Sequence, residues 1–88
     1  MKRTTTTEVL REAVAFILEI DVAGVQSSST LVELGIDSLT ASQLLIEAEI
    51  RLDREVPFEL IEDLSEIATI DDLAAAIERH FSHTELVD

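Results

Sequence analysis

The neighbouring Asp37 and Ser38 are the residues whose types could do chemistry, and they precede a long amphipathic pattern. A serine hydroxyl is a weak nucleophile at neutral pH unless a base, usually histidine, lies beside it. The only histidines are His80 and His83, near the other end of the chain. We therefore predict that Ser38 catalyses nothing itself and is instead modified by another enzyme.

The start of a helix suits a serine with this role. The first amides of a helix are unpaired, and its dipole favours a phosphate diester at this end. Asp37 could hold a metal ion or a basic residue of the modifying enzyme. A purely structural role also stays open, because aspartate and serine are both common N-cap residues.

Other residue clusters do not predict a ligand site. His80 and His83 are one helical turn apart, but no third metal ligand accompanies them, so a solvated helix end is expected. Asp71 and Asp72 fit the acidic first turn of a helix. Without cysteine, the chain has no disulfide or thiolate ligand, and no metal site is predicted.

Length and composition limit the fold that could position Ser38. The 88 residues allow one core, and 47% hydrophobic with only 3% aromatic residues favours helices. The net charge of −13 disfavours nucleic acid and membrane partners and favours basic patches on proteins, although solubility alone could explain it. No signal peptide or membrane segment is evident, so a cytoplasmic monomer is expected.

The hydrophobic pattern predicts a first helix that begins after Thr5, which stands at capping-box spacing from Glu8. A long irregular stretch follows over about residues 21–36, a length that is often functional in a small domain. The expected inward residues of the helix, with Leu18 outside this face, are Val9, Leu10, Ala13, Val14, Phe16, Ile17 and Ile20, and Leu31 and Leu34 could pin the irregular stretch to the core.

Three further helices are predicted. The second runs from about Asp37 to Asp53, with the carboxylate of Asp37 capping its first turn. Pro57 suits the first position of a short third helix, and Thr69 with Asp72 opens a fourth. The expected inward residues of these last two helices are Phe58, Ile61, Leu64, Ile70, Leu73, Ala74, Ile77 and Phe81.

We therefore predict an all-α fold, a small antiparallel four-helix bundle with a short third helix and a long first loop. It forms a single domain over residues 1–88. The folded core covers about residues 5–82, between a frayed N-terminal threonine run and a frayed C-terminal tail that begins at Ser82.

The predicted second helix carries apolar residues on two opposite sides. An apolar stripe with polar flanks opposite a core face predicts a docking surface for partner proteins, unless the helix is buried on both sides of the bundle. Charge reversal at Glu47 and Glu49 is expected to slow partner reactions and leave the fold intact. The core face comprises Ala41, Leu44, Leu45, Ala48 and Leu52, and the docking surface comprises Leu39, Gln43, Ile46, Glu47, Glu49 and Ile50.

The stretch Leu34-Gly35-Ile36-Asp37-Ser38-Leu39 resembles the L-G-x-D-S-L signature of acyl and peptidyl carrier proteins. Its position between a long loop and an amphipathic helix is also similar, as are Val56-Pro57 and Ile67-Ala68-Thr69-Ile70. The resemblance covers roughly residues 9–81. It implies that a phosphopantetheinyl transferase, using coenzyme A and magnesium, attaches 4′-phosphopantetheine to Ser38, with Asp37 and Leu39 completing the cofactor site.

The resemblance implies a carrier without catalysis of its own, which holds acyl, aminoacyl or peptidyl groups as thioesters. Its partners would be the transferase and loading, condensing or tailoring enzymes with basic docking patches. Fatty-acid carriers commonly have acids where this chain has Thr40 and Gln43, and often an aromatic residue where it has Leu31. A free-standing carrier of polyketide or nonribosomal-peptide biosynthesis is therefore expected, and the alternatives are a fatty-acid carrier or an acidic interaction module without a prosthetic group.

Overall fold

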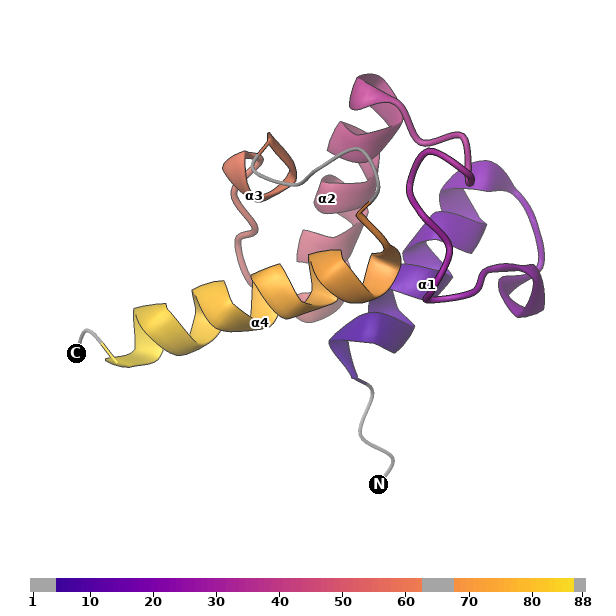
Figure 1. The fold of residues 1–88 in the computed structure, drawn as a ribbon. Coiled ribbons are helices and arrows are strands. Elements are labelled where there is room, and N and C mark those ends of the chain that lie inside the picture. Colours follow the sequence, from indigo (N-terminus) through magenta and orange to yellow (C-terminus); the bar gives the residue numbers. More distant parts are fainter. Residues whose placement is uncertain (1–4, 63–67, 87–88) are drawn as a thin grey trace.

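The protein folds into a bundle of helices joined by one long loop (Figure 1). The computed structural model describes residues 5–62 and 68–86, with side chains as far as Ser82. Helix α1 packs against both α2 and α4, and α3 packs against α4. This arrangement confirms the all-α class with a short third helix. The elements are α1 (Thr6–Leu18), a 3-10 turn η1 (Val22–Gly24), α2 (Ser38–Leu52), α3 (Glu59–Glu62) and α4 (Ile70–Leu86).

Side-chain caps set where the helices begin, as the sequence predicted. Thr5 Oγ1 accepts a hydrogen bond from Glu8 N at 3.2 Å before α1. At α4 the capping box is complete, because Asp72 Oδ2 accepts from Thr69 N at 2.9 Å and Thr69 Oγ1 accepts from Asp72 N at 3.1 Å. Each bond satisfies an amide that the first helical turn leaves unpaired.

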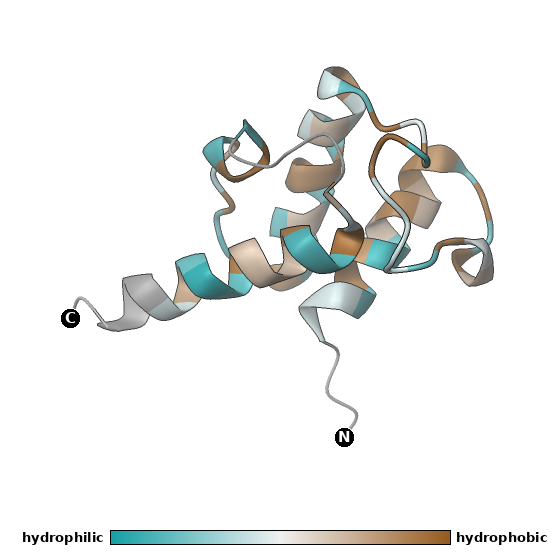
Figure 2. Ribbon diagram, viewed as in Figure 1, coloured by the Kyte–Doolittle hydropathy of each residue, from teal (hydrophilic) through white to brown (hydrophobic). Residues whose placement is uncertain are grey.

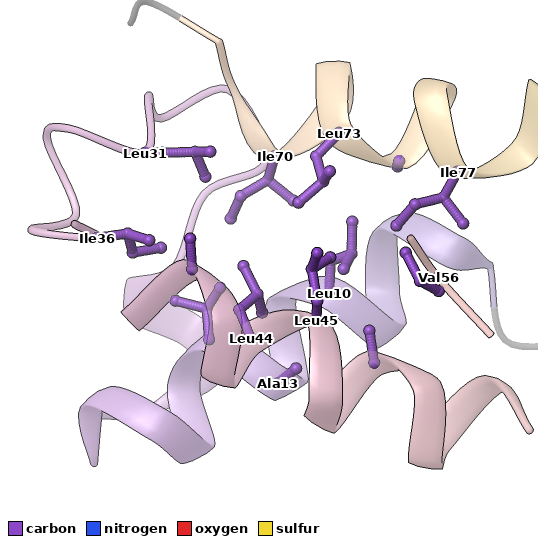
Figure 3. Close-up of a cluster of buried hydrophobic side chains, with 14 of the residues drawn as sticks. Leu10, Ala13, Leu31, Ile36, Leu44, Leu45, Val56, Ile70, Leu73 and Ile77 are labelled. Carbon is purple, nitrogen blue, oxygen red and sulfur yellow. The ribbon is translucent and has the colours of Figure 1, made fainter. Parts of the chain in front are cut away.

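The core lies where α1, α2 and α4 meet (Figure 3). Figure 2 shows that hydrophobic and hydrophilic residues alternate along the long helices, so each helix has one face for this core. None of the helices in residues 5–62 and 68–86 combines the length and apolar character that crossing a membrane requires. The largest fully buried side chains are Leu10, Val14, Val25, Leu44, Ile70, Leu73 and Ile77.

The buried face of α1 differs from the prediction. Phe16 is 64% exposed and Ile20 is 46% exposed, whereas Leu18 packs against the core. Because α1 contacts both α2 and α4, its buried face is rotated toward Ala15, which is also buried. Ile20 lies beyond the end of the helix, where Glu19 turns the chain in the left-handed conformation.

Helices α3 and α4 also depart from the prediction in detail. Phe58 is exposed and lies before α3 rather than inside the core, whereas Ile61 is partly buried. Helix α4 continues through Leu86, beyond Ser82, where the frayed tail was expected to begin. Leu64 and Ile67 lie outside the described residues.

The long first loop is tied down at several points rather than running freely over the surface. Arg11 on α1 donates hydrogen bonds to Val25 O at 2.7 Å and Val22 O at 3.1 Å. The carbonyls of Ser27 and Ser29 accept from Asp71 N and Ile70 N, so the loop caps the first turn of α4. The predicted anchors, Leu31 and Leu34, are buried and partly buried against the core.

Candidate functional site

The turn before α2 begins with a capping box that the sequence analysis missed. Glu33 Oε1 accepts hydrogen bonds from Thr30 N at 2.9 Å and Thr30 Oγ1 at 3.1 Å, and Glu33 N donates to Thr30 Oγ1 at 3.0 Å. The Thr30-Leu31-Val32-Glu33 spacing was the available signal. The bond from Thr30 N lowers the pKa of the Glu33 carboxyl.

The same turn ends at Gly35, whose φ of 79° is left-handed. Gly35 N donates to Val32 O and Ile36 N donates to Leu31 O, both at 3.0 Å, which is the hydrogen-bond pattern of a Schellman motif. Glycine adopts this φ without a Cβ clash. Leu31 and Ile36 are both buried and lie at the same edge of the core (Figure 3), so the residues after Ile36 emerge at the surface.

Asp37 caps α2, as predicted. Its Oδ1 accepts from Thr40 N at 2.9 Å, and its carbonyl accepts from Ala41 N at 2.8 Å. The hydrogen bond from Thr40 N lowers the pKa of the Asp37 carboxyl, which is therefore ionised at neutral pH. The capping role that the sequence left open for this residue is thus confirmed.

Ser38 is the first helical residue and does not act as the cap. Its side chain is exposed and makes no hydrogen bond within the described part of the chain. The amides of Ser38 and Leu39 have no carbonyl partner inside the helix and lie at the positive end of its dipole, although the amide of Leu39 also faces the Asp37 carboxylate. An exposed hydroxyl at the positive end of a helix dipole fits a phosphate diester.

The one histidine side chain that the structure describes, that of His80, is not positioned to activate Ser38. Figure 1 places the C-terminal half of α4, which carries His80, far from the start of α2. The His80 ring instead lies 6.1 Å from the ring of Phe81. The side chain of His83 is outside the described residues, and no group of three or more potential metal ligands occurs among the residues that are described.

Comparison with known proteins identifies the family. Residues 8–82 match the model of the phosphopantetheine attachment site, which covers most of the chain. The chain belongs to this family. Its carrier domain is thus a site for covalent attachment of 4′-phosphopantetheine, and domains of this kind interact with a phosphopantetheinyl transferase and partner enzymes. A search of curated proteins found no match.

The outer face of α2 in this carrier domain is exposed, as the sequence predicted. Leu39, Ile46 and Ile50 are 70%, 58% and 69% exposed, and Gln43 beside them is also exposed. The alternative that α2 is buried on both sides is therefore wrong. The opposite face forms part of the core through Ala41, Leu44, Leu45 and Ala48, with Leu52 partly buried.

Glu47, predicted to dock partners, is held within the carrier domain. Its Oε2 accepts from Arg51 Nε at 2.8 Å, and Arg51 Nη1 lies 3.3 Å from Glu12 Oε1 on α1. The same guanidinium lies 5.8 Å from the centre of the exposed Phe16 ring. The spacing of Glu47 and Arg51, one helical turn apart, was a signal for this pair.

Glu49 is also engaged within the domain. Its Oε2 accepts from Val56 N at 2.8 Å, which ties α2 to the connection that leads to α3. Reversing the charges of Glu47 and Glu49 would therefore remove contacts inside the domain. Such a change would alter the stability of the domain as well as docking, so a test of docking uses other residues.

Proposed function

We infer that Ser38 is the residue of this carrier domain that receives 4′-phosphopantetheine. The observation that supports this most strongly is its exposed position as the first residue of α2, at the positive end of the helix dipole. Its neighbours have structural roles: Gly35 turns the chain, Ile36 fills the core and Asp37 caps the helix. Within residues 35–38, the serine side chain is the one without a structural role in the domain.

In this proposal the protein holds the intermediates, and the partner enzymes catalyse the reactions. The attached arm supplies a thiol, on which acyl, aminoacyl or peptidyl groups are carried as thioesters. The positive end of the α2 dipole favours the phosphate, and the ionised Asp37 carboxylate attracts a metal ion or a basic residue of the transferase. Among the side chains that the structure describes, no histidine lies beside Ser38, which supports a carrier role rather than an enzymatic one.

We assign the carrier to polyketide or nonribosomal-peptide biosynthesis. Thr40 and Gln43 support this assignment, because they stand where fatty-acid carriers commonly have acids, and Gln43 is exposed to a docking partner. A fatty-acid carrier is the alternative. The mass of the native group on the purified protein distinguishes them, since a long saturated acyl chain would contradict the assignment.

Intact-protein mass spectrometry tests the attachment residue. The protein is incubated with coenzyme A, magnesium and a broad-specificity transferase, and we expect one added phosphopantetheine. Ser38→Ala should abolish the addition and change the free energy of unfolding by less than about 0.5 kcal/mol. Ser28→Ala replaces another exposed serine, in the first loop, and is the matched control, which should be modified normally.

Two outcomes would contradict this assignment. Addition that persists in Ser38→Ala would move the site to another residue. The absence of addition to the folded wild-type protein would favour the acidic interaction module without a prosthetic group.

The outer face of α2 is our proposed docking surface for basic patches on partner enzymes. Its exposed apolar residues and the net charge of −13 support this role. We expect Leu39→Ser and Ile50→Ser each to lower the kcat/KM of loading by up to roughly tenfold, with unchanged melting. Phe16→Ser replaces an exposed apolar residue on α1 and should load normally. Equal loading by all three variants at low salt would exclude this surface.

A further inference from the structure

A second exposed surface lies on α1, apart from the outer face of α2. Phe16 is 64% exposed, although it is one of only three phenylalanines in the chain. Ile20, four residues later and just beyond the end of α1, is 46% exposed. Exposed carboxylates accompany them, at Glu12 one turn before Phe16 and at Glu19 at the end of the helix. We call these four residues the α1 surface.

The domain's own Arg51 shows which chemical group this surface can bind. From α2, its guanidinium lies 5.8 Å from the centre of the Phe16 ring, and its Nη1 lies 3.3 Å from Glu12 Oε1. A ring beside a carboxylate suits a guanidinium, because the flat cation stacks on the ring while its N–H groups donate to the acid. The ring nevertheless remains mostly exposed, and Arg51 is held more closely by Glu47, at 2.8 Å. A second guanidinium can therefore reach both the ring and Glu12.

The charges around the α1 surface also favour a basic partner. The chain carries 19 acidic residues and 6 lysines and arginines. Arg11 is the one basic residue of α1, and its guanidinium turns to the first loop, where it donates to Val22 O and Val25 O. Glu12 and Glu19 therefore attract cations to this surface. An acidic partner would be repelled, and a purely apolar one would bury carboxylates without a partner.

The α1 surface leaves Ser38 uncovered. Ser38 is the first and Arg51 the penultimate residue of the 15-residue α2, so the two are about 20 Å apart along its axis. Arg51 also faces α1, about 100° around the helix from Ile50 on the outer face. A segment bound beside Phe16 would thus leave both the serine and the outer face of α2 open to other enzymes.

We propose that the α1 surface binds an arginine-bearing, basic segment of a partner protein, independently of the arm on Ser38. A partner guanidinium stacks on Phe16 and pairs with Glu12, and an apolar side chain beside it covers Ile20. The surface thereby holds the carrier in a complex while the enzymes that act on the arm dock on α2. Binding at α1 is tested on the unmodified protein, so it and the attachment at Ser38 can fail separately.

The probe is a synthetic helical peptide with leucines on one face and arginines beside them. Isotope-labelled, unmodified protein is titrated with it at low salt, and proton–nitrogen correlation NMR spectra follow each surface separately. We expect the amide signals of Glu12 and Phe16 and the Nε–H signal of Arg51 to shift. A peptide with lysine in place of every arginine should bind here about three- to tenfold more weakly, because an ammonium group cannot stack flat on the ring.

Three variants separate the contacts. Phe16→Ser removes the ring and should weaken binding at the α1 surface about five- to tenfold, whereas the peptide-dependent shifts of Leu39 and Gln43 on α2 should persist. Glu12→Gln removes the pairing carboxylate and should weaken binding about two- to fourfold. Val32→Ser is the matched control, because Val32 is also 64% exposed but lies in the turn before α2, and it should leave binding at the α1 surface unchanged.

Shifts confined to the outer face of α2, or equal affinities of the arginine and lysine peptides, would overturn the proposal. Signals of Phe16 that shift with protein concentration alone would also overturn it, since a second copy of the chain would then cover this surface. If Phe16→Ser does not fold, Glu12→Gln and the two peptides on the wild-type protein still decide. After attachment of the arm the affinity at the α1 surface should be unchanged, and a difference would contradict its independence from the arm.

Discussion

A residue in the left-handed backbone conformation lies at each end of α2, but the residue type differs between the two ends. Gly35, before the helix, has a φ of 79°, and Asp53, after it, has a φ of 56°. At the start, glycine turns the chain without strain and a buried Ile36 and a capping Asp37 follow. At the end, the left-handed residue carries a Cβ, and its carboxylate lies at the negative end of the helix dipole. The end that presents Ser38 thus combines a turn without backbone strain and a helix cap.

Gly35→Ala should change the free energy of unfolding most, because it places a Cβ on the left-handed residue before α2. A Cβ at Gly35 would meet no atom within 4 Å, so the cost comes from the left-handed backbone and should be about 1–2 kcal/mol of unfolding free energy. Urea unfolding measures it. Gly24→Ala is the matched control, because its Cβ also meets nothing within 4 Å and its φ is not left-handed, so its effect should stay within about 0.5 kcal/mol. Equal effects of the two substitutions would mean that the turn before Ser38 tolerates a side chain.

Asp53→Gly, at the other end of α2, should stabilise the domain, whereas Gly35→Ala destabilises it. It removes the Cβ from a left-handed position and a negative charge from the helix C-terminus, and should raise the unfolding free energy by about 1 kcal/mol. Asp53→Asn removes only the charge and tolerates the left-handed region better than most residues, so a smaller gain is expected. Thermal melting of the three proteins ranks them, and a loss of stability in Asp53→Gly would show that the carboxylate has a stabilising partner.

Lowering the pH should destabilise the start of α2, by less than the two glycine and aspartate substitutions change the stability. The hydrogen bonds from Thr40 and Thr30 hold the pKa values of Asp37 and Glu33 below the ordinary 3.8 and 4.5. The unfolded chain therefore binds protons first, and the stability that these carboxylates contribute is present above those ordinary values and is lost as the pH falls through the folded ones.

The double variant Asp37→Asn with Glu33→Gln lacks both titrating groups. Its urea midpoint should fall less than that of the wild-type protein between about pH 6 and about pH 3. The pair Glu59→Gln with Glu78→Gln removes two exposed carboxylates elsewhere and controls for net charge. If both double variants respond to acid alike, the caps before and at the start of α2 are not the source of the acid sensitivity.

Local patterns were sufficient to predict much of the fold and the site. Capping boxes, helix periodicity and the signature around Ser38 depend on residues a few positions apart, and they gave the starts of α1, α2 and α4, the two faces of α2 and the exposed serine. The predicted start of the third helix at Pro57 was wrong, because α3 begins at Glu59. The rotation of the buried face of α1 was not predictable in this way. It depends on α2 and α4 packing on α1 together, which exchanges the environments of Phe16 and Leu18.

Contacts between segments that a turn of the chain brings together were also not predicted from the sequence. The bond between Glu49 and Val56 forms only because the chain turns at Asp53, so periodicity assigned Glu49 to a flank of the docking surface. A pocket along α2 has the same origin, since one of its walls is α2 and the other comes from residues 56–58. Hydrogen bonds between the first loop and α4 likewise join segments that are distant in sequence.

Those loop bonds have a consequence for how the domain opens. Ser27 and Ser29 accept from the first amides of α4, and Leu31 N donates to Ala68 O beside them. The loop therefore cannot swing away from the bundle without uncovering the start of the last helix. In native-state hydrogen exchange, the amides of Ile70, Asp71 and Leu31 should belong to one cooperative opening unit. A partner protein that binds the loop next to Ser38 would then also slow amide hydrogen exchange at the start of α4, although it does not contact that helix.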